Sequence, residues 1–152
     1  MNLKNKIIVI TGASDGVGKQ TALRLAREGT KLALISRNEE KLNEVFQQSI
    51  ELGALDVKVY PCDIRQTDKL ENIVKSILSD YGSVDILINN AGIWQKLMPI
   101  EEIDKNVIDD VIQTNLTALI HLTGMLIPSL KSKPESAIIN VISKSGIVPQ
   151  GY

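Results

Sequence analysis

Short apolar runs alternate along the chain with longer amphipathic segments, and few architectures can bury both. The runs are continuous and rich in β-branched residues, as is typical of strands covered on both faces of a parallel sheet. Helices that connect parallel strands form right-handed crossovers and cover both faces of the sheet. We therefore predict an α/β fold with a doubly wound parallel sheet. Its five strands are expected at 7–10, 31–36, 57–61, 86–88 and 137–142.

Helix start and stop signals bound the segments between these strands. Asn38 is the expected N-cap of the second helix, and Thr67 or Asp68 that of the third. Gly82 lies where the third helix should end, because glycine favours the left-handed conformation of a helix C-terminus. The helical segments are expected at about 16–28, 38–52, 70–78 and 103–131, the last in two pieces.

Length and charge exclude several classes of protein. The chain has 152 residues, the length of one domain, and we treat 1–152 as a single unit. Seventeen basic and eighteen acidic residues leave a net charge of -1, so no electrostatic footprint for nucleic acid or an anionic membrane is present. The apolar stretch 117–130 is shorter than the roughly 20 residues that span a bilayer.

The cysteine and histidine counts limit the chemistry further. One cysteine and one histidine exclude a His/Cys-rich zinc site, and we predict no metal. A lone thiol, with no secretory segment before it, favours a cytoplasmic location. We expect Cys62 to be a small buried apolar residue and His121 to lie in the core or at an interface.

A glycine-rich turn follows the first strand. Gly12, Gly16 and Gly18 stand in the spacing G-x-x-x-G-x-G before the first helix. Glycine lets the backbone turn sharply and a ligand approach closely, and the helix N-terminus offers N–H groups to a phosphate. We interpret the turn as a pyrophosphate site. Two alternatives compete: a turn selected only for tight packing, and an NTPase P-loop, whose spacing differs by one residue and whose Ser/Thr is replaced by Gln20.

Five motifs in a characteristic order carry a family resemblance. The sequence reads T-G-x-x-x-G-x-G at 11–18 and N-N-A-G at 89–92, with Asp63 after the third strand, Asn115 in the long helical region and 140–143 ending in Ser143. Over essentially its whole length, the chain resembles the short-chain dehydrogenase/reductase family. The resemblance implies a Rossmann-type oxidoreductase that transfers a hydride between a nicotinamide cofactor and a carbonyl or alcohol carbon of a small-molecule substrate.

The resemblance also implies roles for single residues. Ser143 would hydrogen-bond the substrate oxygen, and Asn115 would support a proton relay. Both have alternatives, because Ser143 could only cap a loop, the N-N-A-G turn could only close a strand, and Asn115 stands in a formal glycosylation sequon. Trp94 would line the substrate pocket or cover the core. The expected cofactor-binding residues are Gly12, Ser14, Asp15, Gly16, Val17, Gly18, Ser36, Arg37, Asp63, Ile64, Asn89, Asn90, Ala91 and Gly92.

The end of the second strand bears on the choice of cofactor. An acidic residue there would bind the ribose hydroxyl of NAD, whereas Ser36 and Arg37 suit the 2′-phosphate of NADP. We therefore predict NADP(H) rather than NAD(H). Asp15 and Glu39 argue against this prediction, and Arg37 could instead be a solvated cation at a helix start.

The family's Tyr-x-x-x-Lys acid/base pair is missing from the sequence. Tyr152 is the last residue, nine positions after Ser143, and we do not assign it as the acid/base. We expect the true tyrosine to lie beyond the end, the fold to be truncated after the fifth strand, and these 152 residues alone to be inactive. The alternative is a non-catalytic NADP(H)-binding module. At full length, the resemblance implies a homo-oligomer.

Overall fold

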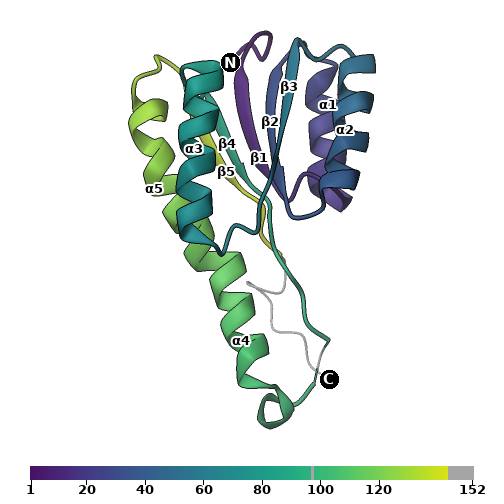
Figure 1. Ribbon diagram of the computed structural model, residues 1–152, viewed down its shortest axis with the longest axis vertical. Helices are drawn as coiled ribbons and strands as arrows, with labels where there is room; N and C mark the ends of the chain where they lie inside the picture. The colour runs from purple at the N-terminus through teal and green to yellow at the C-terminus, as the bar shows by residue number, and fades with distance from the viewer. Residues whose placement is uncertain (97, 144–152) are drawn as a thin grey trace.

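A five-stranded parallel sheet forms the centre of the protein, in the order β3-β2-β1-β4-β5 (Figure 1). The computed structural model describes residues 1–96 and 98–143. The strand order reverses between β1 and β4, as in a Rossmann-type doubly wound sheet, which confirms the predicted fold class. The strands are β1 (Ile7–Thr11), β2 (Lys31–Ser36), β3 (Asp56–Pro61), β4 (Ile86–Asn89) and β5 (Ala137–Asn140).

Helices cover both faces of this sheet (Figure 1). Successive side chains of a strand point to opposite faces, so the buried strands supply both layers. In β1, Ile8 and Ile10 belong to the core under the first helix pair, and Val9 to the core under the second. The first pair is α1 (Gly16–Ala26) and α2 (Glu39–Glu51), and the second is α3 (Thr67–Tyr81) and α5 (Ala118–Lys131).

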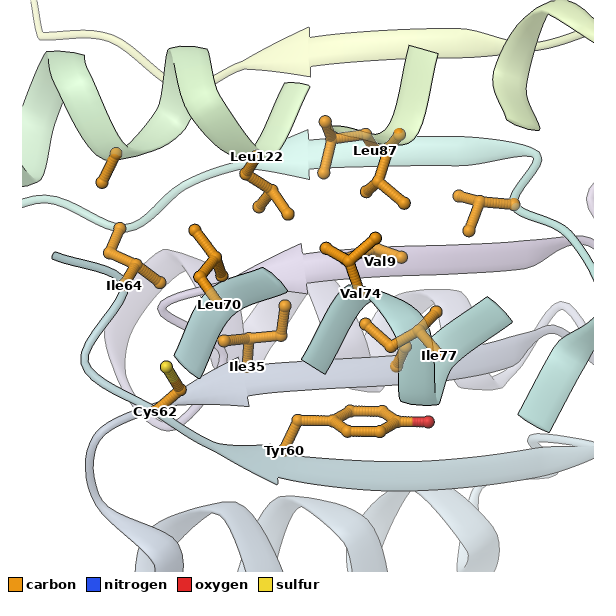
Figure 2. Packing of buried hydrophobic residues seen from close by; sticks show 14 of the residues in the cluster. Val9, Ile35, Tyr60, Cys62, Ile64, Leu70, Val74, Ile77, Leu87 and Leu122 are labelled. Atoms are coloured by element: carbon orange, nitrogen blue, oxygen red, sulfur yellow. The ribbon is translucent and has the colours of Figure 1, made fainter. Parts of the chain in front are cut away.

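The packing of α3 and α5 on the sheet explains the helical spacing of apolar residues in the sequence of α3. Leu70, Val74 and Ile77 of α3 project onto the sheet, and Leu122 of α5 lies beside Leu87 of β4 (Figure 2). All five side chains are at most 5% exposed. Burial of each such side chain contributes roughly 1.5–3 kcal/mol, so this face specifies the position of the helix.

The element boundaries confirm some local predictions and correct others. Asn38 caps α2, since its Oδ1 accepts from the Lys41 N–H at 2.9 Å. Gly82 ends α3 with φ at +76°. The predicted side-chain cap of α3 is wrong: Gln66 is the N-cap and makes no capping bond. The preceding turn closes on Asp63, whose carbonyl accepts from the Gln66 N–H, so the helix starts before Thr67 could cap it.

The fifth strand is shorter than predicted. It was expected to reach residue 142, but β5 ends at Asn140, which pairs with Asn89, the last residue of β4. One further hydrogen bond runs from the Val141 N–H to the Asn89 carbonyl at 2.9 Å. Because β4 ends at Asn89, it offers no further residue with which β5 could pair.

The long helical region is continuous rather than divided in two. A 3₁₀ turn at Ile100–Glu102 precedes α4 (Lys105–Ile112), and π-helical Gln113–Thr117 joins α4 to α5. By length and apolar composition alone, 105–131 would suffice to cross a membrane, a test that core helices of soluble proteins also pass. The sequence analysis measured only the apolar stretch 117–130, which is part of this helix.

His121 lies on α5 and is exposed, so the prediction that it lies in the core is wrong.

A buried carboxylate holds together the amino ends of three strands of the sheet. Asp85 directly precedes β4 and is 5% exposed. Its Oδ2 accepts from the Ile7 N–H at 2.9 Å, and its Oδ1 lies 3.3 Å from Lys6 Nζ and 3.8 Å from Lys133 Nζ. Its backbone carbonyl accepts from the N–H of Ala137. One residue therefore ties together the starts of β1, β4 and β5.

Removing this carboxylate should destabilise the whole sheet. Asp85→Ala leaves the Ile7 N–H and the Lys6 ammonium without their acceptor, and we expect the free energy of unfolding to fall by about 1–3 kcal/mol. Asp85→Asn keeps an oxygen for the Ile7 N–H and should lose less. Urea unfolding measures both losses. Equal losses in the two variants would show that the hydrogen bond to Ile7 contributes nothing.

Candidate functional site

A cleft of about 1110 Å³ lies over the carboxyl ends of the strands. The residue after each of β1, β2, β4 and β5 lines it: Gly12, Arg37, Asn90 and Val141, and β3 contributes Cys62 and Asp63 through the loop that follows it. This is the edge where the strand order reverses between β1 and β4, which is the usual ligand position in an open α/β sheet. Residues of all five motifs thus line one cleft.

The glycine loop forms one wall of the cleft. Gly12 has φ at +66°, and a Cβ there would lie 2.9 Å from the Ala91 Cα. Gly18, in the first turn of α1, packs under the loop, since a Cβ there would lie 2.2 Å from the Gly12 carbonyl oxygen. Gly18 therefore does not line the cleft but permits the loop to lie on the helix. Both interpretations of the turn therefore hold: Gly18 allows close packing, and Gly12 leaves the backbone wall of the cleft open.

Thr11 holds the N-N-A-G turn against the glycine loop. Its buried Oγ1 accepts from the N–H groups of Asn90 and Ala91, at 3.0 and 2.9 Å. In return, Asn90 Nδ2 donates to the carbonyls of Thr11 and Gly12, at 3.0 and 3.2 Å. Four hydrogen bonds between the ends of β1 and β4 set the spacing of the two loops.

Asn89, the first residue of that turn, points away from the cleft. It is 2% exposed, and its Nδ2 donates to Thr123 Oγ1 at 3.0 Å and to Asn140 Oδ1 at 2.9 Å. These bonds join β4 to α5 and β5. Asn89 was predicted to bind the cofactor, but the structure places it where it supports the sheet, whereas its neighbours Asn90, Ala91 and Gly92 do line the cleft.

Asn115 lies in the π-helical turn and anchors the loop after β4. Its Oδ1 accepts from the Ile93 N–H at 2.8 Å, and its Nδ2 donates to the Ile93 carbonyl at 2.9 Å. A Cβ on Gly92 would lie 3.4 Å from Asn115 Oδ1. Asn115 and Ser143 both line the cleft, at the end that also holds Trp94. Tyr152 lies outside the described residues.

The opposite end of the cleft carries the charged residues. Ser36 Oγ lies 2.7 Å from Ser14 Oγ, which joins the end of β2 to the glycine loop. Arg37 is exposed, and it has no ion-pair partner within residues 1–96 and 98–143. The Asp15 carboxylate caps α1 and pairs with Lys41 Nζ at 2.6 Å, and the hydrogen bond from Lys41 lowers the pKa of that carboxyl.

Asp63, which follows the edge strand β3, also lines the cleft, and its charge is already paired. Arg65 donates to both of its carboxylate oxygens, and these hydrogen bonds lower the pKa of Asp63. The neighbouring Cys62 is 6% exposed, as predicted, and burial raises the pKa of its thiol. Ile64 follows on the same wall.

Trp94 lines the cleft, as one of its two interpretations predicted. It is 79% exposed, so the alternative as a cover of the core is wrong.

Sequence reasoning missed several lining residues. Cys62 was predicted to be buried but not to line the cleft. The other missed residues lie within two positions of predicted ones or, like Leu119, follow one turn of helix later, and this proximity was the only signal. They are Ile93, Thr114, Leu119, Val141 and Ile142.

A comparison with models of protein families shows to which family the chain belongs. The family model described as short chain dehydrogenase matches residues 6–151. The chain belongs to the short-chain dehydrogenase family. It is therefore an oxidoreductase by family, and the resemblance inferred from its five motifs is confirmed.

Similar proteins cover nearly the whole chain. An uncharacterized oxidoreductase of Staphylococcus saprophyticus is 33% identical over 150 residues, which is 97% of this chain and 58% of that protein. The 3-oxoacyl-acyl-carrier-protein reductase of Thermotoga maritima is 31% identical over 147 residues, 97% of this chain and 59% of that protein. The chain therefore spans about three-fifths of the length of these curated relatives.

Solved structures agree with this assignment. NAD⁺-bound xylitol dehydrogenase has a TM-score of 0.92 at 29% identity, over 99% of this chain and 57% of that one. A metagenomic short-chain oxidoreductase in complex with NADP also has a TM-score of 0.92 at 29% identity, over 99% of this chain and 67% of that one. The neighbours thus include complexes with either cofactor.

The Thr11 hydroxyl should contribute more to the free energy of unfolding than the Thr11 methyl group does. Thr11→Val keeps the shape but leaves the N–H groups of Asn90 and Ala91 without an acceptor, so we expect a loss of about 2–4 kcal/mol in the free energy of unfolding. Amide hydrogen exchange at Asn90 and Ala91 should accelerate in parallel. Thr11→Ser, which keeps the hydroxyl and loses a methyl group, is the control and should cost about 1 kcal/mol. A larger loss in Thr11→Ser than in Thr11→Val would contradict this account.

Proposed function

We propose that the protein is an NADP(H)-dependent oxidoreductase that acts on a carbonyl or alcohol carbon of a small molecule. The cleft suits a dinucleotide because it extends from the exposed Arg37 after β2, across the glycine loop after β1, to Ser143 after β5. When bound, the nicotinamide supplies or accepts the hydride. The protein would contribute binding, orientation and hydrogen bonds. Its substrate would lie at the end lined by Trp94, Asn115 and Ser143.

One observation carries the preference for NADP(H): the guanidinium of Arg37, at the end of β2, has no ion-pair partner among the residues that the structure describes. A planar guanidinium pairs with a phosphate through two parallel hydrogen bonds. Ser36 Oγ, beside it, offers a hydroxyl to the same group. The carboxylate of Asp15 argued against NADP in the sequence, but Lys41 pairs with it and offsets its charge. No other carboxylate stands at the end of β2 before Arg37.

The geometry also refines the roles proposed for the catalytic end. Ser143 would donate to or accept from the substrate oxygen. Both the oxygen and the nitrogen of the Asn115 side-chain amide are bonded to the Ile93 backbone. A contribution of Asn115 to proton transfer would therefore run through its backbone carbonyl in the π-helical turn, while its side chain positions the loop that bears Trp94.

Cofactor titration of the full-length protein tests the proposal. We expect NADPH to bind at least about tenfold more tightly than NADH, and Arg37→Ala to remove most of that difference by weakening NADPH alone. Isothermal titration calorimetry gives both dissociation constants. Arg27→Ala, at an exposed arginine after α1, is the matched control. Tighter binding of NADH by the wild-type protein would refute the NADP(H) preference.

Turnover separates an enzyme from the alternative, a non-catalytic NADP(H)-binding module. Oxidation of NADPH in the presence of a panel of carbonyl compounds supports the enzyme. Cofactor binding with no turnover of any aldehyde, ketone or sugar in the panel supports the binding module.

We further propose a cytoplasmic homo-oligomer. The one thiol in the sequence is buried and unpaired, which suits a reducing compartment. Ile112, Leu116 and Ile120 are 50–59% exposed at intervals of four residues, so they form an apolar stripe along one helix face. A stripe of this kind commonly marks a protein interface.

A charge in the stripe should dissociate the oligomer. Leu116→Glu buries a carboxylate at the proposed interface, and light scattering after size-exclusion chromatography should report a smaller species than the wild type. Ile50→Glu makes a similar change at an exposed residue of α2 and should leave the mass unaltered. A monomeric wild-type protein would end this proposal.

A further inference from the structure

Trp94 is a large apolar side chain that stands on the rim of the cleft with most of its surface in water. The hydrophobic gain of a side chain depends on the area that is removed from water. An indole that is 79% exposed therefore contributes little to folding. Because Trp94 lines the cleft, a molecule bound there would cover the apolar area that the fold leaves open.

The backbone that carries Trp94 is fixed, although its side chain is exposed. The preceding residue, Ile93, donates its N–H to Asn115 Oδ1 at 2.8 Å and accepts at its carbonyl from Asn115 Nδ2 at 2.9 Å. Asn115 belongs to the π-helical turn that continues directly into α5, and α5 packs on the sheet. A side chain that is presented from a fixed backbone loses less entropy on binding than one on a mobile loop.

Apolar side chains reach this end of the cleft from three parts of the fold. The loop after β4 contributes Trp94, α5 contributes Leu119, and the segment after β5 contributes Ile142. Ile142 is 73% exposed, so it too has apolar area that a ligand could cover. Ser143, the residue proposed to bond the substrate oxygen, follows Ile142 directly. A carbonyl group held by Ser143 would therefore have apolar surface beside it.

The charged lining of the cleft comes from other loops. Within the described part of the chain, the charged residues that line the cleft are Asp15, Arg37 and Asp63, which follow β1, β2 and β3. At the apolar end, the Asn115 amide is already bonded through both of its polar atoms to Ile93. The lining thus divides into a charged part, which suits the phosphates of a cofactor, and an apolar part, which suits a carbon skeleton.

We propose that Trp94 is a specificity-determining residue whose indole contacts an aromatic or other apolar group bonded to the carbonyl carbon of the substrate. The inference rests on the proposed function, since it assumes reduction of a carbonyl beside Ser143. In that reaction NADPH gives a hydride to the carbonyl carbon, and a proton from water goes to the oxygen. An aromatic aldehyde becomes a benzylic alcohol, and NADPH becomes NADP⁺. Aromatic rings in contact stabilise each other beyond the area that they bury.

Steady-state kinetics of the full-length protein test this contact with benzaldehyde and acetaldehyde as substrates. We expect kcat/KM to be at least about tenfold higher for benzaldehyde, because its ring buries apolar area that a methyl group lacks. Trp94→Ala should remove most of this preference by raising KM for benzaldehyde, and should leave kcat/KM for acetaldehyde unchanged. Trp94→Phe keeps a ring and should retain most of the preference. Ile100→Ala, at an exposed apolar residue of the following 3₁₀ turn that does not line the cleft, is the matched control.

Tryptophan fluorescence provides a readout that does not depend on turnover. Benzyl alcohol, added to the full-length protein together with NADP⁺, should change the tryptophan emission of the wild type. Trp94→Phe should abolish that change, since residues 1–152 contain no other tryptophan. An equal change in the two proteins would show that the alcohol does not contact Trp94, and would overturn the inference.

The ratio of the two kcat/KM values, rather than the rate itself, decides the kinetic outcome. A merely structural role of Trp94 would lower both values equally, so an unchanged ratio in Trp94→Ala overturns the inference. A wild type that reduces sugars or other polar carbonyl compounds but not benzaldehyde overturns the inference alone. Failure of the wild type to oxidise NADPH with any carbonyl compound refutes the proposed enzyme, and the inference with it.

Discussion

The hydrogen bonds between the end of β1 and the turn after β4 are the contact on which the cleft depends. Thr11 accepts from two N–H groups of that turn, and Asn90 donates back to two carbonyls. Thr11 is fully buried and its partners are half-buried. Loss of these bonds would leave polar groups shielded from water without partners, which costs more than an ordinary hydrogen bond contributes. The two loops are therefore held at one spacing, with the glycine wall between them.

The same device recurs around the cleft: one polar side chain fastens each loop to its neighbour. Ser14 and Ser36 join the glycine loop to the end of β2, Asn115 holds the loop after β4, and Arg65 connects the loop after β3 to α4. The apolar layers beneath are rigid because close packing tolerates little movement. Polar side chains on a rigid sheet are what a dinucleotide site requires, since orientation is the main contribution of the protein to hydride transfer.

Much of the fold and part of the site could be predicted before the structure. The buried strands and the amphipathic helices could be predicted because they follow from local sequence pattern. The cap of α2 at Asn38 and the end of α3 at Gly82 could be predicted for the same reason. The cap of α3 could not be predicted, because the turn on Asp63 competes with Thr67 for the helix start. Most predicted cofactor residues line the cleft, but Gly18 and Asn89 support it from beneath. Their motif spacing is the same for either role, so sequence alone does not separate them.

The sequence by itself determined the order of strands and helices along the chain and which loops carry polar residues, because both follow from the side-chain period and chain connectivity. Its five motifs also determined the family. Only the tertiary structure decided which charges are paired. Asp15 meets Lys41 and Asp63 meets Arg65, while Arg37 is left without a partner among the described residues. Pairing depends on distances of a few ångströms between residues on different loops, and the folded sheet, not the spacing along the chain, sets those distances.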